Sequence, residues 1–396
     1  MTAISGPNLF AAEFKADPYP VFDKLRREAP VRPIELPTGR GWLVTRYADV
    51  RQVLADPRLS KSLDEVPVDL GYNLLPPERR RVAFHMLNAD PPTHTRLRRL
   101  VAKVFTSGRV EGLRPRIREI AEELVRRTAG RGRADLVADF SFPLPITVFC
   151  ELVGVPTADR DAFRAWTGAM VAPPTPDSLM AARDHMTDYL AALIVDKRRH
   201  PGDDLLSDLV AVRGEDDRLS EPELLSMAFL LLLAGFETTV NLIGNGVYLL
   251  LTHPDTYARL RADRSLIPAA VEEFLRFESP LAGSTPRVTT EPVEIGGVTI
   301  PAGELVFASL ASANRDPDRY ANPDRLDIDR TDGGHVAFGH GIHFCVGAPL
   351  ARVEGQVAFD TLLTLLPELH LTVPADALVW RPGILMRGLV DLPVHW

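Results

Sequence analysis

Apolar side chains recur at three- and four-residue intervals through much of the chain after residue 110. Ile117, Ile120, Leu124 and Val125 follow this spacing, which places them on one face of a helix. A longer helix is predicted further on, where Ser220 and Glu223 form a capping box around Pro222. It can run to His253, just before Pro254, over about 33 residues or roughly 50 Å.

Strand-like apolar runs are short and lie toward the two ends of the chain. They occur at 42–45, 293–295, 298–300 and 388–390. Gly296-Gly297 separates the middle two runs and suits a tight hairpin turn. The pattern therefore predicts a mainly α protein with small β-sheets.

The composition excludes several classes of protein. The chain has 396 residues, 45% apolar and 25% charged, with a net charge of −8, which is ordinary for a globular protein and gives no sign of bulk nucleic-acid binding. Its 34 prolines are dispersed, without repeats or a linker, so we expect one domain over residues 1–396. The apolar stretch 224–236 is shorter than the roughly 20 residues of a membrane span. No basic segment followed by an apolar run opens the chain, so we expect a cytoplasmic protein.

The two cysteines differ in their surroundings. Cys150 lies in an apolar segment and is predicted to be a small buried side chain. Cys345 lies near the end of a glycine-rich segment, 338–347, and a helical pattern begins at Ala348. Backbone N–H groups and the helix dipole lower the pKa of a thiol placed there, so that it can bind a metal as a thiolate.

The rest of this segment suits a flat cofactor. Gly339, Gly341 and Gly347 let the backbone approach closely, and Phe338 can pack beneath. One alternative is a buried structural cysteine. Another is a zinc site built from His335, His340, His343 and Cys345, although these residues do not show a familiar zinc spacing.

Segment 338–347 fills every fixed position of F-G-x-G-x-H-x-C-x-G, the heme-binding signature of the cytochrome P-450 superfamily. The chain therefore resembles that family, especially its soluble actinobacterial members that tailor macrolides and other polyketides. The resemblance implies a triangular-prism fold with heme b between a long central helix and the helix after the cysteine loop. Cys345 would be the axial ligand to the iron, and Phe338, Gly339 and Gly347 would contact the cofactor. The implied activity is that of a monooxygenase that uses O2.

Glu273 and Arg276 stand three residues apart on a predicted helix. Such a pair is ordinarily a weak surface interaction. The resemblance instead implies a buried structural cluster that Arg325 completes, in which loss of one member would leave an uncompensated charge.

The long predicted helix contains the segment 234–239. Ala234 and Gly235 leave room for a cofactor, and Glu237 and Thr238 place an acid beside a hydroxyl. One alternative is that the threonine bonds its own helix while the acid faces solvent. The resemblance implies that Glu237 and Thr238 are catalytic and relay protons during O2 activation. Phe236 stands where many bacterial members have histidine.

His94 and Arg98 lie four residues apart and share a helix face. The resemblance implies that these two residues, with Arg287 and His343, bind the heme propionates. Arg96, Arg99 and Lys103 would face outward for an acidic electron donor, unless they form an ordinary solvated basic face. The implied partners are a ferredoxin and an NAD(P)H-dependent ferredoxin reductase, acting on a monomer.

By the same resemblance, the substrate pocket draws on loops and helices near 61–88, 166–185, 229–238, 281–286 and 384–386. Its candidate residues are Phe84, Met86, Leu87, Met170, Val171, Leu230, Phe236, Leu281 and Met386. Most are apolar, so we expect a hydrophobic substrate such as a polyketide or macrolide, with a steroid or terpenoid as the alternative. A further alternative is a heme protein that binds or senses a ligand without turnover.

Overall fold

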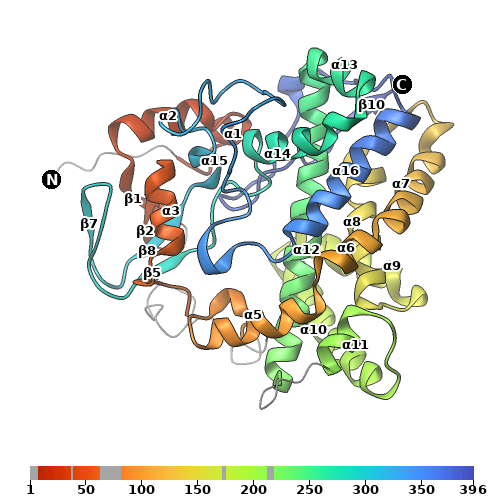
Figure 1. Ribbon diagram of the computed structural model, residues 1–396, viewed down its shortest axis with the longest axis horizontal. Coiled ribbons are helices and arrows are strands. Elements are labelled where there is room, and N and C mark those ends of the chain that lie inside the picture. Colours follow the sequence, from red (N-terminus) through yellow and green to blue (C-terminus); the bar gives the residue numbers. More distant parts are fainter. Residues whose placement is uncertain (1–7, 37–38, 63–81, 172–174, 212–217) are drawn as a thin grey trace.

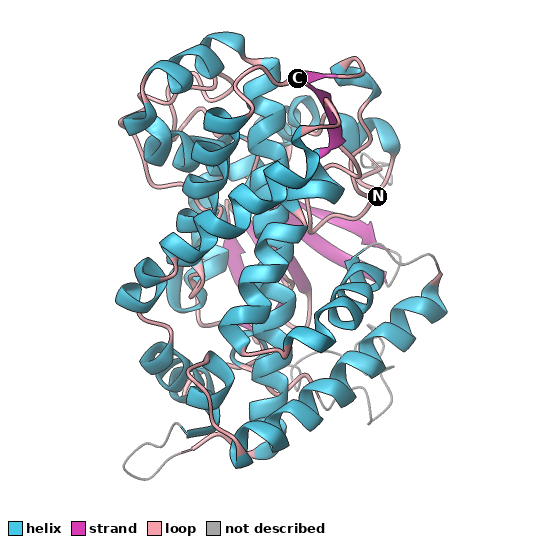
Figure 2. Ribbon diagram, turned by 90° about the vertical axis from the view of Figure 1, so that its right-hand side faces the viewer, coloured by secondary structure: helices cyan, strands magenta, loops and turns pink. Residues whose placement is uncertain are grey.

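The computed structural model describes residues 8–36, 39–62, 82–171, 175–211 and 218–396. Helices surround one long central helix, α12 (Glu221–Thr252), and a smaller region of strands lies to one side (Figure 1). Figure 2 shows the same dominance of helices from a second direction. The expected fold class, mainly α with small sheets, is confirmed.

The other helices fall into three groups along the chain. The first group is α1 (Ala12–Ala16), α2 (Tyr19–Glu28), α3 (Tyr47–Ala55), α5 (Thr93–Val104), α6 (Ser107–Gly112) and α7 (Arg114–Ala129). The second is α8 (Pro143–Val153), α9 (Arg160–Val171), α10 (Pro176–Arg199) and α11 (Leu205–Ala211). The third, after α12, is α13 (Pro254–Ala262), α14 (Ile267–Phe277), α15 (Leu310–Ala313) and α16 (Ala348–Leu365).

The largest sheet has five strands in the order β1-β2-β8-β5-β3, and only β2 and β8 run parallel. Its strands are β1 (Val31–Leu36), β2 (Gly39–Val44), β3 (Leu59–Ser60), β5 (Arg287–Thr289) and β8 (Leu305–Ala308). A second sheet joins β4 (Arg133–Asp135), β10 (Pro393–His395) and β9 (His370–Leu371). The predicted strand at 42–45 corresponds to β2.

The predicted hairpin is confirmed as β6 (Val293–Ile295) and β7 (Val298–Ile300), which pair antiparallel. Gly296 and Gly297 take φ of 56° and 79° in its turn, a conformation that side chains disfavour. The predicted strand at 388–390 is wrong. Leu389 makes only an isolated bridge with Trp380, and the last strand is β10.

The central helix begins and ends where the sequence predicts. The Ser220 and Glu223 capping box is formed, and Pro254 stops the helix after Thr252. α12 packs against α8, α10, α14 and α16. It is long and apolar enough to cross a membrane, but 67% of its apolar window is buried inside the protein. Apolar burial among the surrounding helices therefore accounts for its composition.

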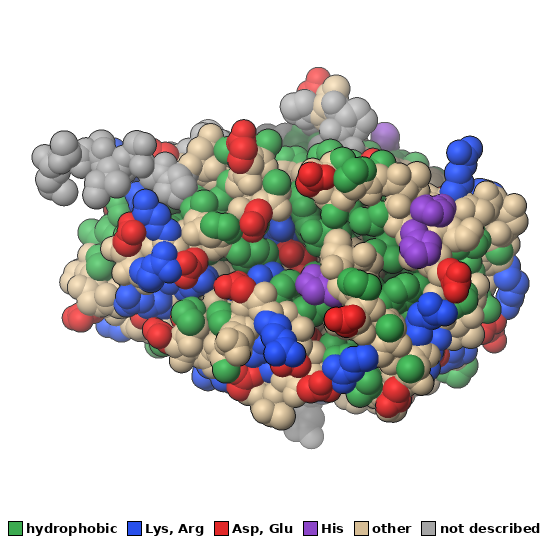
Figure 3. Space-filling model, turned by 90° about the horizontal axis from the view of Figure 1, so that it is seen from above, with side chains coloured by type: hydrophobic (Ala, Val, Ile, Leu, Met, Phe, Trp, Pro, Cys, Tyr) green, Lys and Arg blue, Asp and Glu red, His purple; other side chains and the backbone are tan. Residues whose placement is uncertain are grey.

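The helix predicted from the spacing after residue 110 is α7, which buries Ile117, Ile120, Leu124 and Val125 and packs against α16. Cys150 is fully buried in α8, as predicted. Acidic and basic side chains are interspersed on the face shown in Figure 3. That arrangement agrees with the modest net charge of −8.

Glu273 on α14 is the centre of a buried ionic cluster that holds the segment before the cysteine loop. Arg276 donates to both of its carboxylate oxygens at 2.7 Å and to the carbonyl oxygens of Asn314 and Pro323 at 2.8 and 2.9 Å. The backbone N–H of Asp327 also donates to Glu273, at 2.8 Å. The E-x-x-R pair is thus buried and structural.

The predicted third member, Arg325, is wrong. Its side chain is exposed, and it contributes only its backbone carbonyl, which accepts from Arg276 at 3.2 Å. Arg330 takes the ionic position instead, with its Nε 3.3 Å from Glu273 Oε2. Both arginines follow the same turn, and the course of the backbone decides which side chain reaches the carboxylate.

The two arginines give a matched test of this cluster. Arg330→Leu removes a cation from a buried carboxylate, so we expect it to lower the free energy of unfolding by about 2–4 kcal/mol. Arg325→Leu changes an exposed side chain and should stay within about 0.5 kcal/mol of wild type. Urea denaturation of both variants measures the difference. Equal losses, or a larger loss for Arg325→Leu, would contradict the assignment.

Candidate functional site

Cys345 lies at the end of the loop that leads into α16. Its backbone N–H donates to Phe338 O at 2.9 Å, which closes the loop. Gly339 and Gly341 both have φ of 75°, and a side chain at Gly341 would meet Leu54 O at 3.0 Å. The glycines at these two positions are therefore required by the backbone and by close packing.

The Cys345 thiol receives backbone hydrogen bonds from Gly347 and Ala348, at the start of α16. The lowered pKa that the sequence suggests is not found for the chain alone. Desolvation by the surrounding protein raises the pKa of Cys345, although these two N–H groups and the nearby Arg98 lower it. A metal cation at the sulfur would reverse the balance, because a coordinated thiol loses its proton outright. The residue keeps an accessible surface through which a ligand can reach it.

An ion pair between α16 and α14 supports the cysteine loop. Arg352 on α16 donates to both carboxylate oxygens of Glu272 at 2.7 and 2.8 Å, and its guanidinium lies 4.6 Å from the centre of the Phe338 ring. The sequence analysis missed this pair. Glu272 stands beside Glu273 in the sequence, but nothing in the spacing distinguishes their partners.

The three histidines of the alternative zinc site contact different neighbouring residues. His335 contacts Glu272 at 3.3 Å, and His340 contacts Arg51 at 3.1 Å. His343 instead stacks with His94, with ring centroids 4.3 Å apart. Among the described residues, no three His, Cys, Asp or Glu side chains are arranged to hold a metal ion.

The four predicted propionate ligands converge beside the cysteine loop. His94 and His343 are in ring contact, and Arg98 donates to Phe344 O at 2.6 Å. Arg287 is buried and donates to Leu59 O and Leu54 O at 3.2 and 3.0 Å. Residues from α5, β5 and the loop before α16 thus form one group.

Several nitrogens of this group have no protein partner. They are both ring nitrogens of His94, Nε2 of His343 and Nε of Arg287. Burial, and then the charge of Arg287, lower the pKa of His343 to about 2. Buried polar atoms without a partner are costly, and Asp90 is the carboxylate that acts on Arg287 and His94. The group therefore fits a ligand that carries anionic oxygens, such as the carboxylates of a heme.

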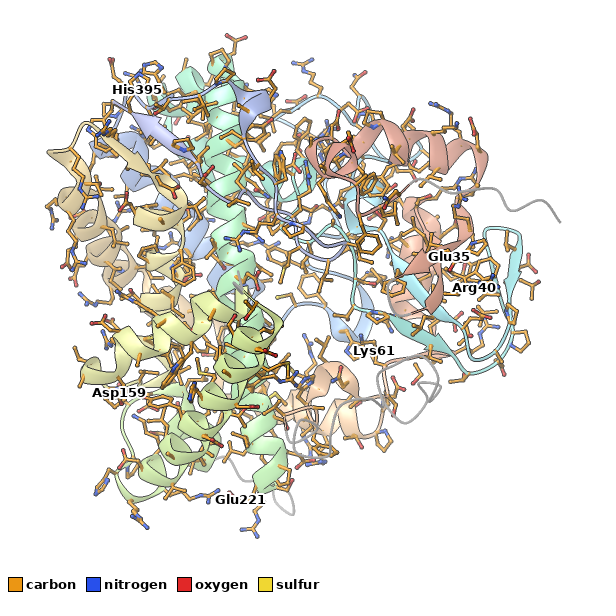
Figure 4. The ribbon with its side chains drawn as sticks, turned by 180° about the vertical axis from the view of Figure 1, so that it is seen from behind. Glu35, Arg40, Lys61, Asp159, Glu221 and His395 are labelled. Carbon is orange, nitrogen blue, oxygen red and sulfur yellow. The ribbon has the colours of Figure 1, made fainter. Side chains whose placement is uncertain are left out.

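Lys61 belongs to the same region and was missed by the sequence analysis. It lies between α5 and the strands of the larger sheet (Figure 4). Its Nζ donates to Thr285 Oγ1 at 2.6 Å and to Pro286 O at 3.0 Å. Burial, and then the charge of Arg287, lower the pKa of Lys61 to about 7. A lone lysine after a short strand carries no sequence signal for this position.

On the central helix, Ala234 and Thr238 lie one turn apart. Ala234 is exposed although most of its neighbours on α12 are buried. The hydroxyl of Thr238 donates to Ala234 O at 3.0 Å. Burial raises the pKa of Glu237 to about 7, and Arg381 opposes the rise. The helix therefore offers an open surface beside an acid that titrates near neutrality.

Two predictions for this helix need correction. Gly235 does not face the same space as Ala234, because a side chain there would meet the Phe149 ring of α8 at 3.2 Å. Phe236 is a core residue and not part of a pocket, since it is fully buried and packs edge-on against Phe142 at 5.9 Å. Both side-chain directions follow from the packing of α12 against α8.

The other substrate-pocket candidates have mixed positions. Met86 and Leu230 are buried in the main core, and Leu87 and Met170 pack against it. Phe84 is 56% exposed. Leu281 and Met386 form an antiparallel bridge, which brings two of the predicted segments together. The side chain of Val171, and the part of the predicted loop at 63–81, lie outside the described residues.

The predicted basic face of α5 is only partly available. Arg96 is not directed to solvent alone, because it forms an ion pair with Glu223 at the start of α12. Lys103 and Arg99 are exposed. The available basic face is therefore smaller than the sequence suggests.

Known proteins resemble this chain over its whole length. The family model for Cytochrome P450 matches residues 170–367. The vitamin D(3) 25-hydroxylase of Pseudonocardia autotrophica is 51% identical, covering 98% of this chain and 96% of the relative. The mycinamicin IV hydroxylase/epoxidase of Micromonospora griseorubida is 46% identical, covering 95% and 94%. The solved structure of the tirandamycin C-bound P450 monooxygenase TamI is 47% identical, with a TM-score of 0.89 and coverage of 97% and 98%.

The raised pKa of Glu237 predicts a pH-dependent stability. The folded protein keeps this proton up to about pH 7, whereas the unfolded chain releases it near 4.5. The contribution is complete below pH 4.5 and is lost as the pH rises through 7. Relative to Glu237→Gln, wild type should therefore lose on the order of 2 kcal/mol of unfolding free energy between pH 4.5 and 8. Denaturant titrations at several pH values measure this, and parallel curves would contradict it.

Proposed function

Because the chain belongs to the cytochrome P450 family, we propose that it hydroxylates or epoxidises a hydrophobic secondary metabolite of the polyketide or macrolide type. It is a heme-dependent monooxygenase that uses O2 and takes electrons from NAD(P)H through redox partners. We propose that residues 1–396 form one catalytic domain, which works as a monomer in the cytoplasm. The observation that carries it is the Cys345 sulfur under the N–H groups of Gly347 and Ala348 at the start of α16.

We assign the heme to the space beside this sulfur. Cys345 would bind the iron, with Phe338, Gly339 and Gly347 along the cysteine loop and Ala234 on α12. His94, Arg98, Arg287 and His343 would bind the propionates, which supply the acceptors that their unpaired nitrogens lack. When bound, the heme supplies the iron at which O2 is activated, and the thiolate donates electron density that favours O–O cleavage.

Residues of the chain would stabilise the negative sulfur and transfer protons. The N–H groups of Gly347 and Ala348 stabilise the negative sulfur. Glu237, with a pKa of about 7, can both release and regain a proton at working pH. Thr238 donates its own hydrogen to Ala234 O, so its oxygen remains an acceptor for a proton passed from Glu237. We propose that these two residues are the catalytic proton relay.

The substrate class rests on the relatives and on the apolar candidates near the site. Two similar proteins are named for mycinamicin IV and tirandamycin C. Leu87, Leu281 and Met386 are partly exposed apolar side chains on the segments expected to line the pocket, and Leu281 and Met386 bridge two of these segments. The 51% identity to a vitamin D(3) 25-hydroxylase favours a steroid-like substrate as the second candidate. Spectral titration with a macrolactone and with vitamin D3 separates the two classes.

The thiolate assignment is tested by the difference spectrum between the reduced protein and its CO complex. We expect a strongly red-shifted Soret band for wild type, because Cys345 would bind the iron as a thiolate. Cys345→Ser should lose the shift, while Cys150→Ser, buried in α8, should retain it. An unshifted band in wild type would show that Cys345 is not the thiolate ligand.

We further propose that a ferredoxin, reduced by its reductase, docks on the exposed side of α5. Lys103→Glu should slow reduction by a ferredoxin about three- to tenfold at low ionic strength, because it reverses a charge in the encounter. The effect should fade in high salt. Lys24→Glu, an exposed charge reversal on α2, is the matched control. Equal rates for the two variants would contradict docking at α5.

A further inference from the structure

A polar ridge follows one side of the otherwise apolar central helix. Glu237, Asn241 and Asn245 are spaced four residues apart, so they lie one above another on α12. Asn241 and Asn245 are 2% and 1% exposed. Polar side chains buried this deeply cost free energy unless they find partners.

Two amide atoms on this ridge have no protein partner. Asn245 Nδ2 donates to Glu278 O at 3.2 Å and to Arg387 O at 3.0 Å, which fixes the amide and leaves its Oδ1 unpaired. Asn241 Nδ2 is also unpaired. An unmet donor and an unmet acceptor on adjacent turns can both be satisfied by one bridging water.

The C-terminal segment 380–389 covers the ridge. Gly388 lies so close to Asn241 that a side chain there would come within 2.0 Å of Asn241 Oδ1. Arg381 is the charged group that acts on Glu237, and its Nε donates to Leu389 O at 3.1 Å. At Gly388, therefore, no side chain separates segment 380–389 from the ridge. Beside Glu237, the same segment carries the positive charge of Arg381.

A cavity of about 40 Å³ lies against the same segment. Its lining includes Phe14, Lys15, Arg381, Met386, Arg387 and Gly388. One water needs roughly 10–15 Å³ of such space, so more than one can enter. Lys15 donates to Gly383 O, and burial, followed by the charge of Arg387, lowers the pKa of Lys15 to about 8. Arg387 is itself paired with Glu278. The cavity is thus lined by a lysine whose pKa is lowered toward neutrality.

We propose that this cavity and the ridge behind it form the route by which protons reach Glu237. The inference rests on the proposed monooxygenase function. In each cycle one O2 takes two electrons and two protons, one oxygen atom enters the substrate and the other leaves as water. Each proton enters as hydronium in the cavity, passes to the Glu237 carboxylate through water held by Asn241 and Asn245, and leaves a water molecule behind. The two asparagines are positioning residues, and Arg381 favours release of the proton from Glu237 toward Thr238.

The route is tested with Asn241→Leu and Asn245→Leu in the heme-loaded enzyme, supplied with electrons by a ferredoxin and its reductase. NADPH oxidised, O2 consumed and H2O2 released are measured without added substrate, in H2O and in D2O. We expect each variant to slow water formation about tenfold, to release more H2O2 and to show a larger solvent isotope effect. Thr361→Val is the matched control, since it removes another buried, unpaired polar atom from α16.

The CO spectrum of each preparation separates the two proposals. A red-shifted band with unchanged H2O2 release and isotope effect in both variants overturns the proton route alone. A wild type without that band overturns the proposed function and the route with it. A crystal structure of wild type gives a second test that needs no variant to fold. It should show water within hydrogen-bond distance of Asn241 Nδ2 and Asn245 Oδ1, and a dry ridge would overturn the route.

Discussion

The rest of the molecule depends on holding one sulfur as an anion inside the protein. Surroundings of low polarity raise the pKa of Cys345, and only two backbone N–H groups and nearby cations oppose that effect. The loop that aims those N–H groups must therefore be rigid. Arg352 with Glu272 braces it from one side, and the Glu273 cluster fixes the preceding segment. Both groups of charges thus serve the placement of one atom.

The Glu273 cluster and the group around His94 differ in how their charges are compensated. Around Glu273, cations and carboxylate satisfy one another within the chain. Around His94, Arg287 and Lys61, cations and imidazoles converge with donors left over. Asp90 is the carboxylate that acts on these groups. A completed cluster stabilises a fold, whereas one whose cations outnumber its carboxylates and whose donors are left over recognises an anionic ligand. This contrast distinguishes structural from binding arginines where their burial alone does not.

Local chemistry decided what could be predicted from the sequence. The capping box at Ser220, the Gly296-Gly297 turn and the helix that begins at Ala348 depend on neighbouring residues, and each was predicted correctly. Errors arose where distant segments choose between similar side chains. Arg330 takes the place expected of Arg325, and α8 turns Gly235 and Phe236 away from the cofactor space. Lys61 reaches the site through Thr285, a contact across more than 200 residues that no local pattern indicates.

The central helix shows both what the sequence can predict and what it cannot. Its spacing of Glu237, Asn241 and Asn245 is visible in the sequence, and it means that three polar side chains share a face. What they face is decided by the C-terminal segment, through the close approach of Gly388 and the charge of Arg381. Asn245 also stabilises the fold, because an apolar side chain in its place would leave the carbonyl oxygens of Glu278 and Arg387 without their donor. Those bonds do not use Asn241 Nδ2 or Asn245 Oδ1, and these two unpaired atoms beside an acid with a pKa of about 7 are the ones that proton transport along the helix would use.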